Sequence, residues 1–448
     1  MACMIGRTLI GLTLLLAIGP AHAQTIPTAL TGTVLTPSGP IQHGTVLFQN
    51  GKTLAVGDKV PLPPNTHLIE THAILLPSFI DLHNHLTWNI FPRWKPNQKF
   101  GNRYDWQQTT IYDVLMDTPH GELAAEGMNC DMEWYAEVKA VSEGETSVVG
   151  GATENCGPRL ARNLDLDPRL AQPTGPIIYN IFPFEMTEAE LASAKTALDH
   201  NGALLIHVAE GAPNNAAAAR EFDMLKGRGL LRKGVSVIHG VAFTPEDFKA
   251  MATAGTGFIW SPRSNIELYG DTANVAAAKA AGVKMALAPD WSPTGSDGTL
   301  AELNYAATWN ASQYPPVFAD RELVEMTTSE AAALVNLDHE LGTLAPGYAA
   351  DILALRPRDD RKDKDAYWSV VHSDARDVEL VTIAGDTVYA DPSLTAQPAM
   401  NHTEVCGAPK QVIARPATTQ TFEGIEGQLR RALAEWGRKL APLAECGQ

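Results

Sequence analysis

The chain has 448 residues, of which 45% are hydrophobic and 19% charged, and its formal net charge is −17. This composition suits a large buried core in one big domain plus a smaller one, and excludes fibrous and disordered classes. The excess of acid disfavours nucleic acid or an anionic membrane surface as a partner, because both bind basic patches.

The N-terminus has the features of a secretory signal peptide. Arg7 precedes the short apolar run of residues 9–18, and the sequence Ala-His-Ala ends at Ala23. The alternative, a membrane anchor, is disfavoured because a spanning helix needs ~20 apolar residues. Without a twin-arginine pair, we expect Sec-type export with cleavage after Ala23. The mature protein would then be secreted or periplasmic, without membrane insertion.

Cysteine usage agrees with export. Cys3 leaves with the signal, and the four that remain are Cys130, Cys156, Cys406 and Cys446. An even number in an exported protein predicts two disulfides. Three pairings are possible, and the simplest joins sequence neighbours, Cys130 with Cys156 and Cys406 with Cys446. Buried free thiols are the alternative.

Short strands and turns are predicted at both ends of the mature chain. They alternate with Gly, Pro and Asn and cover residues 32–35, 43–48, 53–56, 350–355, 378–383 and 386–389. Because these two β-rich segments flank a central region, we expect them to pair into one small β-sandwich.

Strand-like runs alternate with helix-like runs in the centre, which predicts parallel βα units. The strand-like runs are residues 74–82, 147–151, 177–181, 203–208, 235–241, 256–261 and 283–288, with residues 159–165 as a weaker eighth. This count favours an α/β fold with a TIM-type (β/α)8 barrel over an open sheet. The stretch between Ser147 and Ile177 is short for a full unit, so the barrel would be distorted by a missing helix.

Helices are predicted at residues 188–199 and 245–253, after the N-cap residues Thr187 and Thr244. A further amphipathic helix is predicted at residues 422–440. Between the first strand and the first helix, residues 88–108 are rich in Trp, Pro, Asn and Arg. We expect them to form a long loop at an active-site rim.

The predicted organisation therefore has five segments. They are a signal peptide (1–23), an N-terminal β-sandwich segment (24–75), a central barrel (76–342), a second β-sandwich segment (343–400) and a C-terminal extension with a helix (401–448).

Five polar residues each end an apolar strand-like run: His83, His85, His207, His239 and Asp290. A single such histidine is more often a packed or surface residue, but here the pattern repeats in order. The strand ends of a parallel barrel meet at one face, so these side chains should share one pocket. His83 and His85 are two apart on a strand and should point to the same side. Three histidines and one aspartate suit zinc or iron.

These motifs resemble those of the amidohydrolase superfamily. "PSFIDLHNHL" is similar to its opening metal motif, and "VIHGV" to its sixth-strand histidine. "HVAEG" resembles the H-x-x-E motif of its cytosine, guanine and adenosine-type deaminases and triazine hydrolases. "SPRSNIELYG" and "ALAPDW" resemble its seventh- and last-strand segments, and "TSEAAALVNLDHELGTLAPGYAADILAL" its return from barrel to sandwich. The match runs from about residue 30 to 390 and is specific for the superfamily, not for a substrate.

The resemblance implies one divalent ion, zinc first and iron as the alternative, held by His83, His85, His207 and Asp290. Many relatives bridge two metals with a carboxylated lysine on the fourth strand. The corresponding segment here, "PIIYNIFPF", has no lysine, so one metal is expected.

The resemblance also implies catalytic roles. Asp290 would take a proton from the activated water as general base, and His239 would hydrogen-bond the nucleophile or the developing oxyanion. Glu210 would donate a proton to a ring nitrogen or leaving amine, the alternative being a solvated carboxylate on a loop. Asn265 and Arg263 are candidate substrate contacts or loop-ordering residues.

Trp291 is a candidate wall for a flat substrate, or a packing residue. The predicted function is hydrolysis of a non-peptide carbon–nitrogen bond in a small cyclic or heterocyclic compound, as in a deaminase or cyclic amidase. The alternatives are a peptidase-like or dehalogenating relative and an inactive periplasmic metal- or ligand-binding protein. The last is disfavoured because a scavenger needs no proton donor. The sequence is compatible with a homo-oligomer as well as with a monomer.

Overall fold

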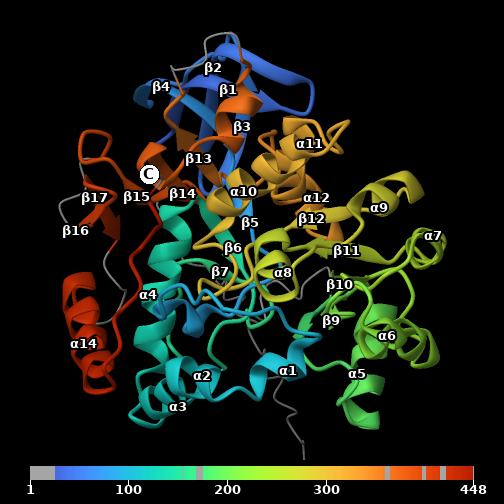
Figure 1. Cartoon of the computed structure of the whole chain (residues 1–448). Coiled ribbons are helices and arrows are strands. Elements are labelled where there is room, and N and C mark those ends of the chain that lie inside the picture. Colours follow the sequence, from blue (N-terminus) through green and yellow to red (C-terminus); the bar gives the residue numbers. More distant parts are fainter. Residues whose placement is uncertain are drawn as a thin grey trace, which may run out of the picture.

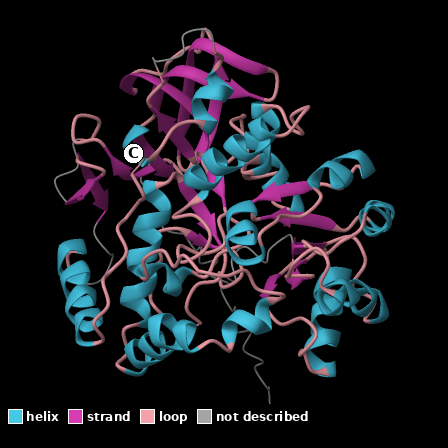
Figure 2. Ribbon diagram, viewed as in Figure 1, coloured by secondary structure: helices cyan, strands magenta, loops and turns pink. Residues whose placement is uncertain are grey.

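The computed structural model describes residues 26–153, 155–167, 175–358, 364–395, 400–413 and 420–446. The predicted signal peptide lies outside these residues. Strands from the two ends of the chain gather in one large sheet, and the central strands lie in two smaller sheets among helices (Figures 1 and 2).

Nine strands form the large sheet in the order β16-β17-β15-β14-β13-β4-β1-β2-β3. Their bounds are β1 (Thr28–Thr36), β2 (Gly39–Gln49), β3 (Lys52–Gly57), β4 (His67–Pro77), β13 (Ile352–Leu355), β14 (Val378–Ile383), β15 (Asp386–Ala390), β16 (Met400–Val405) and β17 (Ala408–Ile413). The two ends of the chain meet where β4 pairs antiparallel with β13, with Leu76 opposite Leu353. The predicted pairing of the two β-rich segments is therefore confirmed.

This sheet differs from the prediction in two places. The run at residues 74–82 was predicted as one strand, but β4 ends at Pro77 and a separate strand begins at Phe79. Proline has no N–H to continue the ladder, which accounts for the break. The hairpin β16–β17, which sequence reasoning missed, lies in the predicted C-terminal extension and adds two strands to the sheet.

Within the described residues, eight parallel strands lie in the centre, in two sheets ordered β5-β6-β7 and β12-β11-β10-β9-β8. They are β5 (Phe79–Ile80), β6 (Glu145–Val148), β7 (Arg162–Asn163), β8 (Ile177–Asn180), β9 (Ala203–Val208), β10 (Val235–His239), β11 (Gly257–Trp260) and β12 (Met285–Leu287). Each overlaps a predicted run, including the weak candidate at residues 159–165. A parallel bridge from Asn84 to Asp290 connects the two sheets beyond β5 and β12. The fold is thus α/β, with parallel strands in the chain order of a TIM-type barrel.

Helices surround these strands. They are α1 (Arg103–Gln107), α2 (Thr110–Tyr112), α3 (Thr118–Ala125), α4 (Asn129–Ser142), α5 (Glu188–Asp199), α6 (Ala216–Gly227), α7 (Pro245–Ala254), α8 (Pro262–Tyr269), α9 (Val275–Ala281), α10 (Thr299–Ser312), α11 (Asp320–Met326), α12 (Ser329–Leu334), α13 (Ala366–Val371) and α14 (Phe422–Glu435), with the short turns η1 (Leu86–Ile90), η2 (Asp113–Asp117) and η5 (Ala375–Asp377). None of the helices in the described part of the chain is long and apolar enough to cross a membrane.

The two predicted barrel helices are confirmed with their caps. The Thr187 side chain accepts a hydrogen bond from the Glu190 backbone at the start of α5, and Thr244 does the same for α7. Between β6 and β8, the described residues contain β7 and no helix, as the short spacing indicated. The predicted loop at residues 88–108 is not free of helix, because it contains part of η1 and all of α1.

The C-terminal helix is shorter than predicted. It ends at Glu435, and Gly437 adopts a φ of 64°, a conformation that glycine takes without strain. The tail then turns back, and its residue Leu440 is buried. The helix α14 packs against α4 and β16 (Figure 1).

Both predicted disulfides are present. Cys130 at the start of α4 is joined to Cys156, and Cys406 after β16 is joined to Cys446. The second bridge fastens the C-terminal tail to the large sheet.

We predict that replacing Cys406 and Cys446 together by serine lowers the free energy of unfolding by about 2–4 kcal/mol, because the unfolded chain loses a covalent constraint. Guanidinium unfolding of the oxidised double variant and the wild type measures the difference. Equal unfolding free energies would show that this bridge does not stabilise the protein.

Candidate active site

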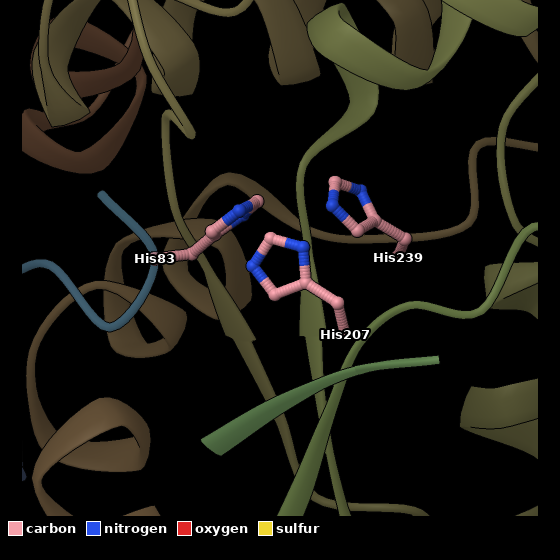
Figure 3. Close-up of side chains that lie close together, drawn as sticks. All are labelled: His83, His207 and His239. Atoms are coloured by element: carbon pink, nitrogen blue, oxygen red, sulfur yellow. The ribbon is translucent and has the colours of Figure 1, made fainter. Parts of the chain in front are cut away.

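The five strand-end residues predicted to meet do share one site. His207 and His239 lie at the ends of β9 and β10, and their rings face that of His83 (Figure 3). The ring centroids of His83 lie 4.7 Å from those of His207 and His239, which are themselves 4.8 Å apart. Asp290 completes the site from the segment after β12.

One carboxylate oxygen joins the first two histidines. Asp290 Oδ1 lies 3.2 Å from His83 Nε2 and 3.3 Å from His85 Nε2. Both histidines are predicted to lie on a strand, but β5 ends at Ile80 and both lie beyond it. Their rings still converge, because the Asp290 backbone N–H donates to the His83 carbonyl at 3.0 Å and holds the two segments together.

Second partners fix how two of the imidazoles are turned. His83 Nδ1 lies 2.7 Å from Ser261 Oγ, and His239 Nδ1 lies 2.9 Å from Asn265 Oδ1. In both rings Nε2 is left facing the site, as in metal-binding histidines whose other nitrogen is held by an outer partner. Asn265 therefore bonds a site histidine and is not among the residues that line the cavity.

The backbone is strained at this site. His239 and Asp290 adopt φ values of 71° and 69°, a region that residues other than glycine rarely occupy. Such strain persists only where the surrounding structure overdetermines it, and it is concentrated at functional sites.

Burial sets the charge state of the site. It lowers the pKa of His83 and His207 well below the ordinary value, so both imidazoles are neutral near pH 7. Burial alone would raise the pKa of Asp290, but the nearby His83 and His85 outweigh it and lower that pKa. Neutral imidazoles around an ionised carboxylate are the forms that bind a cation.

The donor atoms fit a divalent metal. Two groups of close ligand atoms share His83: one contains His207 and His239, and the other contains His85 and Asp290. Nε2 of His83 and Nε2 of His239 are buried and accept or donate no hydrogen bond within the described part of the chain. A cation would satisfy nitrogens that are costly to bury alone.

The strand β8 brings Tyr179 to the position where a bridging lysine was sought. Its hydroxyl lies 3.2 Å from His207 Nε2 and 3.4 Å from His85 Nε2. The absence of a lysine from this segment is evident in the sequence, but the contact of Tyr179 with the two histidines is not predicted by it. The feature of the sequence that could have indicated this contact is a tyrosine within "PIIYNIFPF", two residues after Ile177.

Glu210 is buried beside the histidines. Its Oε2 lies 3.4 Å from His207 Nδ1 and 3.6 Å from His239 Nε2, and only 5% of the residue is exposed. The alternative of a solvated loop carboxylate is therefore wrong.

A cavity of about 400 Å³ opens onto these groups. Aromatic side chains form much of its wall: Trp88, Trp106, Tyr112, Phe182 and Trp291. Trp291, predicted as a candidate wall, also lies 6.0 Å from the His85 ring between centroids. The volume is that of a small-molecule site.

Arg263 has a different environment. Its guanidinium lies 2.7 Å from a Glu445 carboxylate oxygen in the C-terminal tail and 3.3 Å from Ser296 Oγ. It is not among the residues that line the cavity, so of its two predicted roles the geometry favours loop ordering.

Comparison with known proteins agrees with this geometry. Residues 160–388, just over half of the chain, match the model of the amidohydrolase family. A 5-methylthioadenosine/S-adenosylhomocysteine deaminase of Desulfitobacterium hafniense is 25% identical over 370 residues, which cover 72% of this chain and 83% of the relative.

Two solved structures are similar in fold. One is an adenosine deaminase from Xanthomonas campestris with bound zinc, at a TM-score of 0.67 and 14% identity, covering 92% of this chain and 99% of that chain. The other is an atrazine chlorohydrolase from Arthrobacter aurescens TC1 complexed with zinc, at a TM-score of 0.63 and 17% identity, covering 81% and 95%.

The chain belongs to the amidohydrolase family. It is a metal-dependent hydrolase that acts on carbon–nitrogen bonds, with the buried histidines and Asp290 as its candidate metal centre.

We predict one tightly bound divalent ion per chain, because a tyrosine and not a lysine stands on β8 at the site. Elemental analysis of protein purified without chelator measures it. His83→Ala should lose the metal, whereas His200→Ala, at an exposed position after α5, should retain it. Two equivalents that resist dialysis would contradict the single-metal prediction.

Proposed function

We propose that this protein is an exported, zinc-dependent hydrolase that removes an amino group from a small, flat nitrogen heterocycle. The observation that carries the proposal is the position of Glu210. A buried carboxyl group 3.4–3.6 Å from two site histidines faces the same cavity as the metal-binding atoms. Hydrolytic removal of an amine from a ring requires a proton donor. A protein that only binds a metal does not need one.

The relatives support the substrate class. The sequence relative is named as a deaminase of adenine-containing compounds, and the similar structures include adenosine and guanine deaminases. The cavity suits a flat ring, since its aromatic walls can stack on one. A peptidase-like activity has less support, because the sequence relative is named as a deaminase.

The metal would be held by His83, His85, His207 and Asp290, as the motif order implied. When bound, a divalent zinc ion supplies the Lewis acidity that lowers the pKa of a water molecule toward neutrality. The two zinc-containing structures of similar fold support zinc over iron.

The chain's own residues then move the protons. Asp290 is ionised and accepts a proton from the attacking water. His239 Nδ1 lies 2.9 Å from Asn265 Oδ1, which orients the ring so that its Nε2 faces the site and hydrogen-bonds that water. Glu210 delivers a proton to the ring nitrogen or to the leaving amine.

The eight central strands and the large sheet together form the scaffold of the site. We propose that the eight parallel strands form one closed but distorted barrel, and that the large sheet folds over as a sandwich. One buried cluster supports closure, because it contains side chains on or next to all eight strands, among them Ile80, Val149, Leu164, Ile177 and Ile238.

We predict different effects for the two carboxylates. Glu210→Gln keeps the shape of the side chain and should leave metal content near normal, while kcat falls by about 10²–10⁴-fold because the proton donor is lost. Asp290→Asn replaces a charged ligand oxygen and removes the base, so both metal affinity and kcat should fall.

The measurement is metal stoichiometry beside kcat on a substrate found by screening aminated purines, pyrimidines and triazines, with cyclic amides as the competing class. If Glu210→Gln loses its metal or keeps full activity on every substrate, the deaminase proposal fails.

Export is a separate element of the proposal, supported by the two disulfides. We predict a mature N-terminus at Gln24 and a protein located outside the cytoplasm. Mass spectrometry of the intact protein from its native host tests this. A mass that includes Met1 would refute the prediction.

A further inference from the structure

Three side chains form a chain of hydrogen bonds that ends at Glu210. Trp106 Nε1 lies 2.9 Å from the Tyr269 hydroxyl oxygen, which lies 2.6 Å from Glu210 Oε1. All three residues are buried, with 6%, 4% and 5% exposure respectively. They come from α1, from the end of α8 and from the loop after β9, which are far apart in the sequence.

The direction of this chain follows from the chemistry of its first member. An indole N–H can only donate, so the Tyr269 oxygen must accept from Trp106. The hydroxyl hydrogen of Tyr269 is then directed at Glu210 Oε1, which accepts it. Burial and the neighbouring Glu210 raise the pKa of Tyr269 well above its ordinary value, so the hydroxyl keeps its hydrogen.

The two oxygens of Glu210 therefore have different environments. Oε1 is occupied as an acceptor by Tyr269. Oε2 faces the site, 3.4 Å from His207 Nδ1, 3.6 Å from His239 Nε2 and 3.8 Å from the Arg103 guanidinium. In the acid form of Glu210, the oxygen that accepts the short hydrogen bond is the carbonyl oxygen, and the proton resides on the other.

We propose that Tyr269, itself oriented by Trp106, is a positioning residue that turns Glu210 so that Oε2 carries the proton delivered to the leaving amine. The inference rests on the proposed role of Glu210 as proton donor. It assigns Tyr269 an effect on the chemical step through Glu210, without substrate contact.

The surrounding backbone holds the three residues in register. The Phe100 N–H donates to the Leu268 carbonyl at 2.8 Å, which ties the segment before α1 to α8. The Arg103 N–H donates to the Glu210 carbonyl at 3.2 Å, which ties α1 to the loop after β9. Such preorganisation matters because small misplacements of a catalytic group cost large factors in rate.

The test is Tyr269→Phe, which keeps the ring and removes the hydroxyl. Tyr389→Phe is a matched control, because it removes a buried hydroxyl that has no hydrogen-bond partner in the described structure and lies on β15, in the large sheet. Each variant is assayed for metal content, thermal midpoint, kcat and KM. The substrates are an amino heterocycle and the same ring with chloride as a leaving group that needs no proton.

For Tyr269→Phe we expect kcat on the amino substrate to fall by about 10–10²-fold, a fraction of what full loss of the acid costs. KM and metal content should stay within about twofold of wild type, and the chloro substrate should lose much less kcat. Trp106→Phe, which removes the donor to Tyr269 and also alters the cavity wall, should change KM on both substrates and lower kcat with the same leaving-group dependence.

Full kcat in Tyr269→Phe, or equal losses on both substrates, would overturn the inference, because a misplaced donor to the leaving amine does not slow the departure of chloride. If Tyr269→Phe does not fold, the leaving-group dependence of Trp106→Phe decides alone. Full activity of Glu210→Gln would instead overturn the proposed function itself.

Discussion

The imidazole and carboxylate groups of the site are buried away from water and must find partners within the protein. The rest of this structure depends on that constraint. His83 is wholly buried, and His207, His239 and Asp290 are nearly so. A polar group removed from water must find a partner or lose several kcal/mol. Ser261 and Asn265 supply one partner each to His83 and His239. The nitrogens that remain face the site, where a divalent cation would satisfy them.

Because of that constraint, segments that carry no metal ligand also have fixed positions relative to the site. Ser261 and Asn265 flank the start of α8, so the position of this helix sets the orientation of two rings. The same helix ends at Tyr269, which bonds Glu210. One eight-residue helix therefore contacts both the metal side and the proton-donor side of the site.

The C-terminal tail forms ion pairs with the segments around α8. Glu445 lies 2.7 Å from both Arg93 Nε and Arg263 Nη2, and thus joins the segment after η1 to α8. Arg93 in turn donates to the carbonyls of Thr294 and Gly295, in the loop that begins with Trp291. The neighbouring disulfide at Cys446 fastens this tail to the large sheet.

Local sequence patterns predicted most of the central strands, several helix starts and most of the site residues. Alternation of apolar runs placed the parallel strands, cap residues such as Thr187 and Thr244 placed helix starts, and polar residues after apolar runs identified the site. These succeed because strand and helix periods and helix caps depend on neighbours within a few residues. The resemblance of "HVAEG" to the family's H-x-x-E motif singled out Glu210.

The tertiary structure decided which side chains touch. Asn265 bonds a site histidine and Arg263 bonds the tail, although both lie in a motif that suggested substrate contact. Tyr179 and Tyr269 lie in quoted segments but were not predicted to contact the site, because the elements that carry them come together only in the fold. Contacts between residues separated by tens to hundreds of positions depend on packing of whole elements, which no local period or spacing encodes.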